Sequence, residues 1–353
     1  MNKTVLATEA VDIGYAAPRR ANRVIAQGLQ LALRTGEVTC LLGPNGVGKS
    51  TLIRTLAGMQ PPLRGYVELS GVDITSLPLR DLAQRLSVVL TERVHVGNLS
   101  AYALVALGRH PYTDWSGRLT EHDEAVVRWA IESVGSTPLV QRQVDELSDG
   151  ERQRIMIARA LAQEPLVMIL DEPTAFLDLP RRVEMMRLLR QLARTTDRAV
   201  LLSTHDLDLA LRSADVLWLM APGGKIHVGA PEDLVLNGAF EAAFHSEGIE
   251  FDRHSGTFRI NTHTNGSISL SGDGLAVVWT TRALERAGFQ VTQHTNQSLL
   301  HITVSEVDSQ THWAISHPGQ QRTCHSLYDV VIFLRQIIHS TNTKSTHEEI
   351  HHD

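Results

Sequence analysis

The residues with the clearest chemistry lie between positions 43 and 51, where the chain reads Gly-Pro-Asn-Gly-Val-Gly-Lys-Ser-Thr. This run fits the phosphate-binding pattern G-x-x-x-x-G-K-[ST]. Its glycines allow backbone N–H groups to approach a phosphate closely, while the lysine reaches the β- and γ-phosphates and the serine hydroxyl meets Mg²⁺. We therefore predict a nucleoside-triphosphate site, with Ser50 also a metal ligand. The predicted binding residues are Gly43, Pro44, Asn45, Gly46, Val47, Gly48, Lys49, Ser50 and Thr51.

Two adjacent carboxylates, Asp171 and Glu172, follow the apolar run Leu166–Leu170. A strand that ends there brings Asp171 to the carboxyl edge of a sheet, where bound phosphates are expected. Asp171 could then hold Mg²⁺ directly or through water. Glu172 could act as the general base on an attacking water. Acidic pairs also cap helices, but the phosphate pattern earlier in the chain favours the catalytic interpretation.

The segments around these residues have the order that a nucleotide-binding α/β domain needs. Val38–Leu42 is a continuous apolar run, as expected for a strand buried on both faces. A helical apolar pattern follows the phosphate loop from Lys49 to Met59. Further along, strands alternate with helices, which predicts a largely parallel, doubly wound sheet. These predicted elements are the helices Gly150–Gln163 and Arg181–Arg194 and the strands Leu166–Leu170 and Ala199–Ser203.

A third motif, Leu147-Ser-Asp-Gly-Glu-Arg-Gln-Arg154, opens the first of those helices. Together with the phosphate loop and the paired carboxylates, it makes roughly residues 1–235 resemble the ATP-binding cassette (ABC) ATPases. The resemblance implies a P-loop NTPase cassette of the α/β class, with a mostly parallel sheet core, an antiparallel β subdomain and an inserted helical subdomain. It also implies ATP hydrolysis with ATP and Mg²⁺ as cofactors.

The resemblance implies that two cassettes work as a homodimer. Ser148 and Gly150, with Glu151 in the same signature, match residues that contact the nucleotide bound to the opposite subunit. Asp178 matches the loop that crosses the dimer interface.

Three further residues receive roles from the same resemblance. Tyr15 matches the aromatic residue that stacks on adenine, although a single tyrosine in a loop is more often a packing residue. His205, in Ser-Thr-His-Asp after a predicted strand, matches the histidine that senses the γ-phosphate. It joins Glu172 as a predicted catalytic residue.

The chain departs from the family pattern at two places. The family has a coupling glutamine ahead of the helical subdomain, but here the region reads Val88-Val-Leu-Thr-Glu-Arg93, and Glu92 is the nearest match. A carboxylate there would add negative charge close to phosphate; the alternative is that Glu92 is a solvated loop residue. The signature also has Asp149 and Glu151 where the family commonly shows Gly and Gln. An acidic residue is favourable at a helix N-terminus, so Asp149 could simply cap the helix.

The sequence predicts two domains and a tail. We assign residues 1–237 to the ATPase domain, with a helical subdomain at about 93–160, and residues 238–338 to an accessory α/β domain of unknown role. The accessory domain is predicted as strand–helix–strand–strand–helix. Residues 339–353 form a polar tail without predicted structure. The accessory elements are Ser267–Leu270, Leu275–Ala287, Leu299–Val304, Trp313–Ser316 and Leu327–Ile338.

Composition narrows the possible partners. The net charge of −6 argues against a nucleic-acid-binding surface. Two distant cysteines, Cys40 and Cys324, are expected to be reduced thiols.

No signal peptide is evident, and no apolar run approaches the roughly 20 residues that span a bilayer. If the protein works at a membrane, other subunits supply the spans. The resemblance to the ABC ATPases implies a peripheral protein on the cytoplasmic face of the inner membrane, with two permease subunits and, indirectly, a substrate-binding protein.

The segment Leu104-Val-Ala-Leu-Gly-Arg-His-Pro-Tyr112 resembles importers of iron–siderophore, haem or vitamin B12 complexes. The sequence therefore predicts an ATPase subunit that energises import of a metal chelate. Two alternatives are a non-transport ABC ATPase and an ABC regulator with a ligand-sensing C-terminal domain. Of the 17 histidines, 12 lie at or after His245, but without clear ligand spacing, so solvated histidines are favoured over a metal site.

Overall fold

The chain forms two compact units, Met1–His245 and Ser246–Asp353. The computed structural model describes residues 3–17, 21–91, 97–244, 249–252, 256–260, 265–292, 300–307, 310–318 and 320–348. The boundary lies after helices α8 (Pro231–Leu236) and α9 (Ala239–Ala243) rather than at position 238. Phe240 on α9 is fully buried, and α9 packs against strand β10 (Val216–Met220), so both helices belong to the first unit.

A six-stranded sheet forms the centre of the first unit, in the order β11-β10-β4-β9-β8-β7. Neighbouring strands are parallel except for the antiparallel pair β10 and β11 (Ile226–Gly229). Every residue of β4 (Val38–Leu42), β8 (Val167–Leu170) and β9 (Ala199–Ser203) is buried. Such continuous apolar strands are typical of a parallel sheet covered on both faces. The predicted parallel core is confirmed; β7 (Leu86–Val89) forms one edge.

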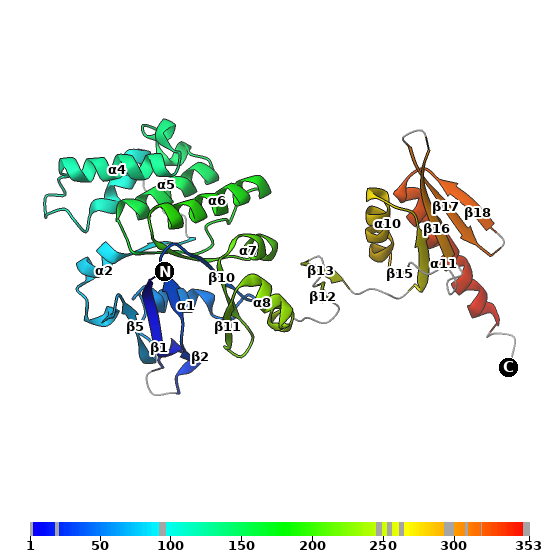
Figure 1. Ribbon diagram of the computed structural model, residues 1–353, viewed down its shortest axis with the longest axis horizontal. Coiled ribbons are helices and arrows are strands. Elements are labelled where there is room, and N and C mark those ends of the chain that lie inside the picture. Colours follow the sequence, from blue (N-terminus) through cyan, green and yellow to red (C-terminus); the bar gives the residue numbers. More distant parts are fainter. Residues whose placement is uncertain are drawn as a thin grey trace. The chain divides into compact units, whose positions relative to one another are not determined.

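A second sheet is antiparallel and contains β1 (Thr4–Tyr15), β2 (Arg23–Leu29), β3 (Ala32–Arg34), β5 (Arg64–Leu69) and β6 (Val72–Asp73). Helix α1 (Lys49–Leu56) contributes Leu52 and Leu56 to one apolar core with Leu6 of β1 and Leu41 of β4. The two sheets and α1 therefore share a core, and Figure 1 shows α1 on the opposite side of the parallel sheet from α6 (Leu179–Thr195). None of the helices in the described part of the chain is long and apolar enough to cross a bilayer.

The inserted helices α3 (Ala101–Ala106), α4 (Glu121–Ser133) and α5 (Asp149–Ala162) pack on one another. Two of them begin with reciprocal capping boxes, which satisfy backbone N–H groups that would otherwise lack partners. In α4 the pair is Thr120 and Asp123, and in α5 it is Ser148 and Glu151. The sequence did not predict two further helices of this unit. They are α2 (Leu79–Arg85), which precedes β7, and α7 (Leu207–Ser213), which follows β9.

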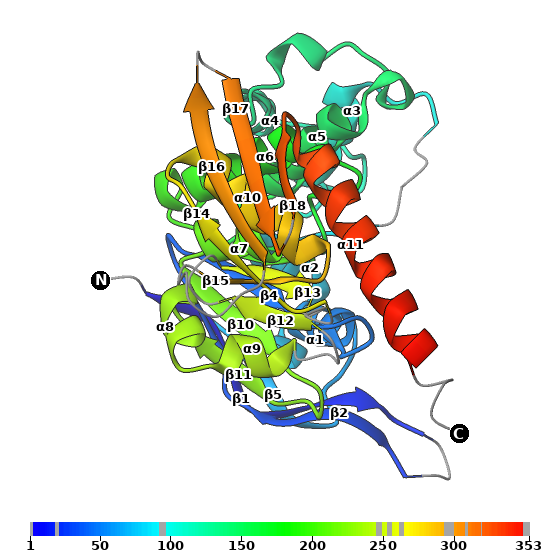
Figure 2. The same ribbon diagram turned by 90° about the vertical axis from the view of Figure 1, so that its right-hand side faces the viewer.

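The second unit contains one mixed sheet, ordered β15-β14-β16-β17-β18, and a separate hairpin of β12 (Ile249–Asp252) and β13 (Thr257–Ile260). Leu284 of α10 (Leu275–Arg286) and Val330 of α11 (Leu327–Glu348) share an apolar core with Ile302 and Trp313 of the sheet. Both helices therefore lie on the same face of it, and Figure 2 shows α11 beside the long strands. The strands are β14 (Ser267–Ser271), β15 (Gln290–Thr292), β16 (Leu300–Val307), β17 (Gln310–His317) and β18 (Gln320–Cys324).

The end of this unit differs from the sequence-based prediction. Helix α11 continues to Glu348, although we expected regular structure to end at Ile338 and a polar tail to follow. No glycine or proline interrupts residues 327–348, so no residue type that breaks helices ends it earlier. Strands β15 and β18 were also missed, because each has few apolar residues.

Candidate nucleotide-binding site

The phosphate loop lies where β4 ends and α1 begins. Gly46 and Gly48 have φ angles of 76° and 117°, a region that glycine adopts without strain. A Cβ added at Gly48 would lie 2.4 Å from Cγ2 of Ile25, whereas one added at Gly46 would meet no atom within 4 Å. The loop is thus tight against the protein at Gly48 and open at Gly46, as a phosphate cradle requires.

The side chain of Lys49 is folded onto this loop. Its Nζ donates to the carbonyl oxygens of Gly43, at 2.8 Å, and Pro44, at 3.2 Å. Burial lowers the pKa of Lys49 from its ordinary value, and the carboxylates of Glu172 and Asp171 act in the opposite direction. An anionic phosphate would give this buried cation a charged partner in place of neutral carbonyls, so the residue fits a triphosphate.

Tyr15 reaches the same loop from the end of β1. Its hydroxyl and Oγ1 of Thr51 share a hydrogen bond of 3.1 Å, and the residue remains 46% exposed. The exposed ring is therefore held beside the start of α1, where a base could stack on it.

Asp171 and Glu172 leave the carboxyl end of β8, next to the end of β9. Ser203, a fully buried residue at the end of β9, connects them: its Oγ donates to Oδ1 of Asp171 at 2.6 Å and accepts from the backbone N–H of Glu172 at 2.9 Å. Sequence reasoning missed Ser203; its signal was a polar residue closing a strand two positions before His205.

The side chain of Glu172 is held by His205. Nε2 of His205 lies 2.5 Å from Oε1 of Glu172. Glu172 also has a φ of 51°, which is uncommon for a residue with a side chain and is often found at functional sites. The structure thus brings together Asp171, Glu172 and His205, three residues that the sequence separated into two motifs.

The signature residues form another group at the N-terminus of α5. The hydroxyl of Ser148 donates to Oε2 of Glu151 at 2.8 Å, and its backbone N–H donates to the same oxygen at 2.9 Å. These two hydrogen bonds lower the pKa of Glu151, so its carboxylate stays ionised. Glu151 therefore fixes the orientation of Ser148, a role that the family's usual glutamine could share as a neutral group.

Arg181 links this helix start to the predicted interface loop. A Cβ added at Gly150 would lie 2.8 Å from one of its guanidinium nitrogens, so the arginine side chain occupies the space that the glycine leaves. The backbone N–H of Arg181 donates to Oδ1 of Asp178, which caps α6 at 3.0 Å. Asp178 and Gly150 are thus both neighbours of Arg181. Figures 1 and 2 show α5 apart from α1 in both views.

Glu92, the predicted coupling residue, lies outside the described residues. Its neighbour Thr91 donates its hydroxyl proton to the backbone carbonyl of Asp171 at 2.7 Å. The chain that follows β7 is therefore hydrogen-bonded to Asp171, at the end of β8, one residue before position 92.

The donor set suits Mg²⁺. In the described parts of the chain, no three His, Cys, Asp or Glu side chains form a group that could hold a metal ion by themselves. Mg²⁺ does not need one, because it usually takes one or two carboxylates together with substrate phosphates and water. The oxygens of Ser50 and Asp171 fit this pattern.

In the second unit, Nδ1 of His312 lies 2.9 Å from Nδ1 of His325, a contact that a hydrogen bond between the rings explains.

A phosphate loop, paired carboxylates at the end of another strand of the same sheet and an inserted helical subdomain define a P-loop nucleotide-binding cassette. Residues 26–175 match the ABC transporter family, and residues 265–335 match the family described as the iron ABC transporter C-terminal domain. An uncharacterized ABC transporter ATP-binding protein of Methanocaldococcus jannaschii is 42% identical over 259 residues, covering 73% of this chain and 88% of that protein. The chain belongs to the ABC transporter ATP-binding family and is an ATPase.

Two further matches come from transporters. The iron(3+)-hydroxamate import ATP-binding protein of Bacillus subtilis is 35% identical over 224 residues, covering 64% of this chain and 81% of that protein. A solved structure of a metal-chelate type ABC transporter in an inward-facing conformation has a TM-score of 0.60 and 28% identity; the match covers 69% of this chain and 90% of that one.

Proposed function

We propose that this chain is the ATP-hydrolysing subunit that energises import of a metal chelate through a separate membrane permease. The observation that carries the proposal is the Asp171–Ser203–Glu172–His205 group at the carboxyl ends of β8 and β9. The iron(3+)-hydroxamate relative and the iron-type C-terminal family support an iron chelate first, with haem and cobalamin as further members of the class.

Each residue of the site receives a role in this proposal. The loop from Gly43 to Thr51 binds the phosphates of ATP, and Tyr15 stacks on the adenine. Ser50 and Asp171 hold Mg²⁺, which neutralises phosphate charge when bound. Glu172 accepts a proton from the attacking water, and His205 orients its carboxylate. Ser203 keeps Asp171 and Glu172 in register.

We further propose that two copies act as a homodimer on the cytoplasmic face of the membrane, bound to two permease subunits that receive substrate from a binding protein. Ser148, Gly150 and Glu151 would then meet the nucleotide of the opposite copy, with Asp178 at the interface. The capping box of Ser148 and Glu151 supports this because it fixes Ser148 at the N-terminus of α5, where the hydroxyl proton now donated to Glu151 would turn to a phosphate oxygen.

We expect vesicles that contain this protein and its permease to accumulate iron(III)–hydroxamate only when ATP is supplied on the side of the cassette. Uptake of labelled chelate measures this directly. Lys49→Ala should abolish it, because the loop loses its only cation. ATP hydrolysis without uptake of iron–hydroxamate, haem or cobalamin would contradict the substrate class.

The permease contact is proposed around the start of α2 and residues 110–117. Leu79 and Trp115 are 84% and 99% exposed, and they border a cavity of about 500 Å³ that is also lined by Arg80 and His110. Exposed apolar side chains that gather around one hollow, rather than single ones, often mark protein interfaces.

We expect Trp115→Ala to weaken association with the permease at least about tenfold, as interfacial tryptophans commonly do. Co-purification of the detergent-solubilised complex measures the association. ATPase activity of the isolated cassette should not change. As a control, Trp129→Ala alters a partly exposed tryptophan on α4, outside the residues that line this cavity. Equal permease binding by wild type and Trp115→Ala would remove this surface from the proposal.

A further inference from the structure

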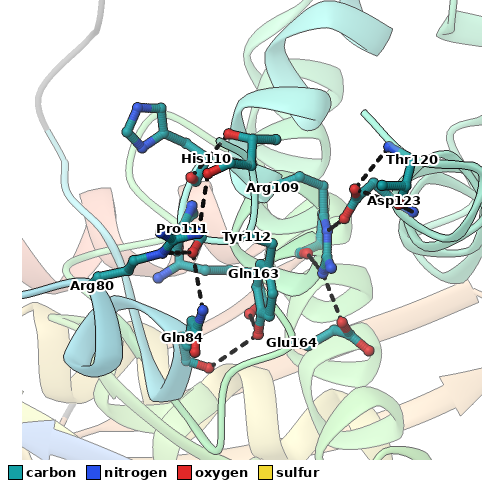
Figure 3. Close-up of polar contacts among 12 residues, drawn as sticks. Arg80, Gln84, Arg109, His110, Pro111, Tyr112, Thr120, Asp123, Gln163 and Glu164 are labelled. Carbon is teal, nitrogen blue, oxygen red and sulfur yellow. Dashed lines mark hydrogen bonds and ion pairs between the residues drawn. The ribbon is translucent and has the colours of Figure 1, made fainter. Parts of the chain in front are cut away.

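The segment Leu104–Tyr112 contains a buried arginine with an unusual number of partners. Arg109 is 1% exposed. Its Nε donates to Oδ1 of Asp123 at 2.9 Å, and one terminal nitrogen donates to the carbonyl of Ala162 at 2.8 Å and to Oε2 of Glu164 at 2.7 Å. The guanidinium also lies 3.8 Å from the ring centre of Tyr112 (Figure 3). An arginine this buried needs such partners, because an uncompensated charge is costly in the interior.

These partners lie at the ends of two helices. Asp123 belongs to the capping box that begins α4, whereas Ala162 and Glu164 lie at the end of α5. Burial acts to raise the pKa of Asp123, but hydrogen bonds from Thr120 and Arg109 outweigh it and lower the pKa overall. A cation at the C-terminus of α5 is also favourable for the helix dipole. Arg109 therefore ties the start of α4 to the end of α5.

The backbone before Arg109 touches α5 directly. A Cβ added at Gly108 would lie only 2.3 Å from the carbonyl oxygen of Arg159, so a larger residue would force the two segments apart. Gly108 and Arg109 hold α5 at neighbouring points, one by close approach and the other by charge.

The same segment connects α5 to the nucleotide-binding core. The hydroxyl of Tyr112 donates to the carbonyl of Gln163 at 3.0 Å, and Nε2 of Gln163 donates to the carbonyl of Leu86, the first residue of β7, at 2.9 Å. Gln84 of α2 donates to the carbonyl of Pro111 at 3.0 Å. Figure 3 shows the contacts of Gln84 and Tyr112 next to those of Arg109.

These contacts fix the C-terminal end of α5. Because the helix is rigid, they also fix the position of its other end, where Ser148 is the N-cap. A helix of 14 residues is about 21 Å long, so a turn of about 10° at its C-terminus moves the N-terminus by nearly 4 Å. Such a displacement exceeds the tolerance of a hydrogen bond.

We propose that Arg109 is a positioning residue for Ser148: it fixes the direction of α5 so that Ser148 meets the nucleotide of the opposite subunit. This inference rests on the proposed function, since it requires the signature to act across a dimer. It also gives the Gly-Arg-His-Pro-Tyr segment a role in assembly that does not depend on the transported substrate.

The test compares Glu172→Gln, expected to collect as an ATP-bound dimer, with Glu172→Gln carrying Arg109→Lys. Lysine keeps the charge and the aliphatic stem but lacks the planar fork that reaches Asp123 and Glu164 together. We expect ATP–Mg²⁺-dependent dimerisation, measured by light scattering on the full chain, to weaken about tenfold or more. The ATP affinity of the dilute monomer should stay within about twofold, because the phosphate loop lies in the core and not on α5.

Matched variants separate positioning from a merely structural role. Arg128→Lys changes an arginine of α4 that pairs with Glu124 at the surface, and it should leave both quantities unchanged. Glu164→Gln removes one partner's charge with little change of shape, and it should weaken dimerisation less, in the same direction. If the Arg109→Lys variant does not fold, the dimerisation of the Glu164→Gln variant tests the inference in its place.

Three results would overturn the inference. The first is undiminished dimerisation of the Arg109→Lys variant. The second is equal loss of dimerisation and monomer ATP affinity, which would make Arg109 only structural. The third is a Glu172→Gln parent that remains monomeric with ATP; that outcome contradicts the dimer in the proposed function itself and removes the role of Arg109 with it.

Discussion

Replacing Glu172 by Gln is expected to leave ATP binding intact and to slow hydrolysis by about 10²–10⁴-fold, the usual contribution of a general base. Glutamine has nearly the same shape but cannot take the proton of the attacking water. The hydrogen bond from the backbone N–H of residue 172 to Ser203 does not depend on the side chain, so Asp171 should keep its place. Phosphate release at saturating ATP measures the rate, and the dimer should accumulate with ATP.

A matched variant is Glu184→Gln. Glu184 pairs with Arg154 at 2.8 Å on the exposed surface, and losing its charge should not alter hydrolysis. His205→Ala offers a second comparison, because it keeps the base and removes the contact that orients it. Turnover of Glu172→Gln close to that of wild type would reject Glu172 as the base.

Mixing two inactive variants, Ser148→Arg and Lys49→Ala, is expected to restore activity. Each homodimer lacks one part of both sites: the first has no usable signature, and the second has no lysine for the phosphates. A heterodimer contains one site with Lys49 from one subunit and Ser148 from the other. Random pairing makes about half of the dimers heterodimers with one good site each, so about a quarter of the wild-type ATPase rate should return.

The stability of α5 has to be controlled, because Ser148 also caps the helix and loss of a cap costs about 1 kcal/mol. Ser148→Asn retains a side chain that caps well, and circular dichroism of both variants separates unfolding from loss of function. Activity should rise with protein concentration in the mixture and in the wild type. A dilute monomer that hydrolyses ATP at the full rate would disprove the composite site.

Local sequence was sufficient for the parts of the site that are continuous in the chain. The phosphate loop is one uninterrupted run. A backbone that wraps an anion needs glycines at fixed spacing, so Gly46 and Gly48 are enough to predict the loop. Asp171 and Glu172 are adjacent and follow an apolar strand. The alternation of buried strands and amphipathic helices likewise indicated a parallel sheet, because burial on both faces leaves a continuous apolar pattern.

Contacts between residues far apart in the sequence could be identified only in the folded structure. Ser203 joins Asp171 to Glu172 only because β9 lies beside β8 in the sheet, and no local pattern states that strand order. Arg109 is an ordinary residue in the sequence, yet docking of α4 and α5 surrounds it with Asp123, Ala162 and Glu164.

The limits of the units have the same explanation. The sequence shows where composition changes, near position 238, but burial of Phe240 against the first unit moves the division to His245. Motifs of contiguous residues are set by backbone conformation, which local sequence controls. Helix docking, strand order and domain limits depend on which apolar faces meet, and that is decided only when the whole chain packs.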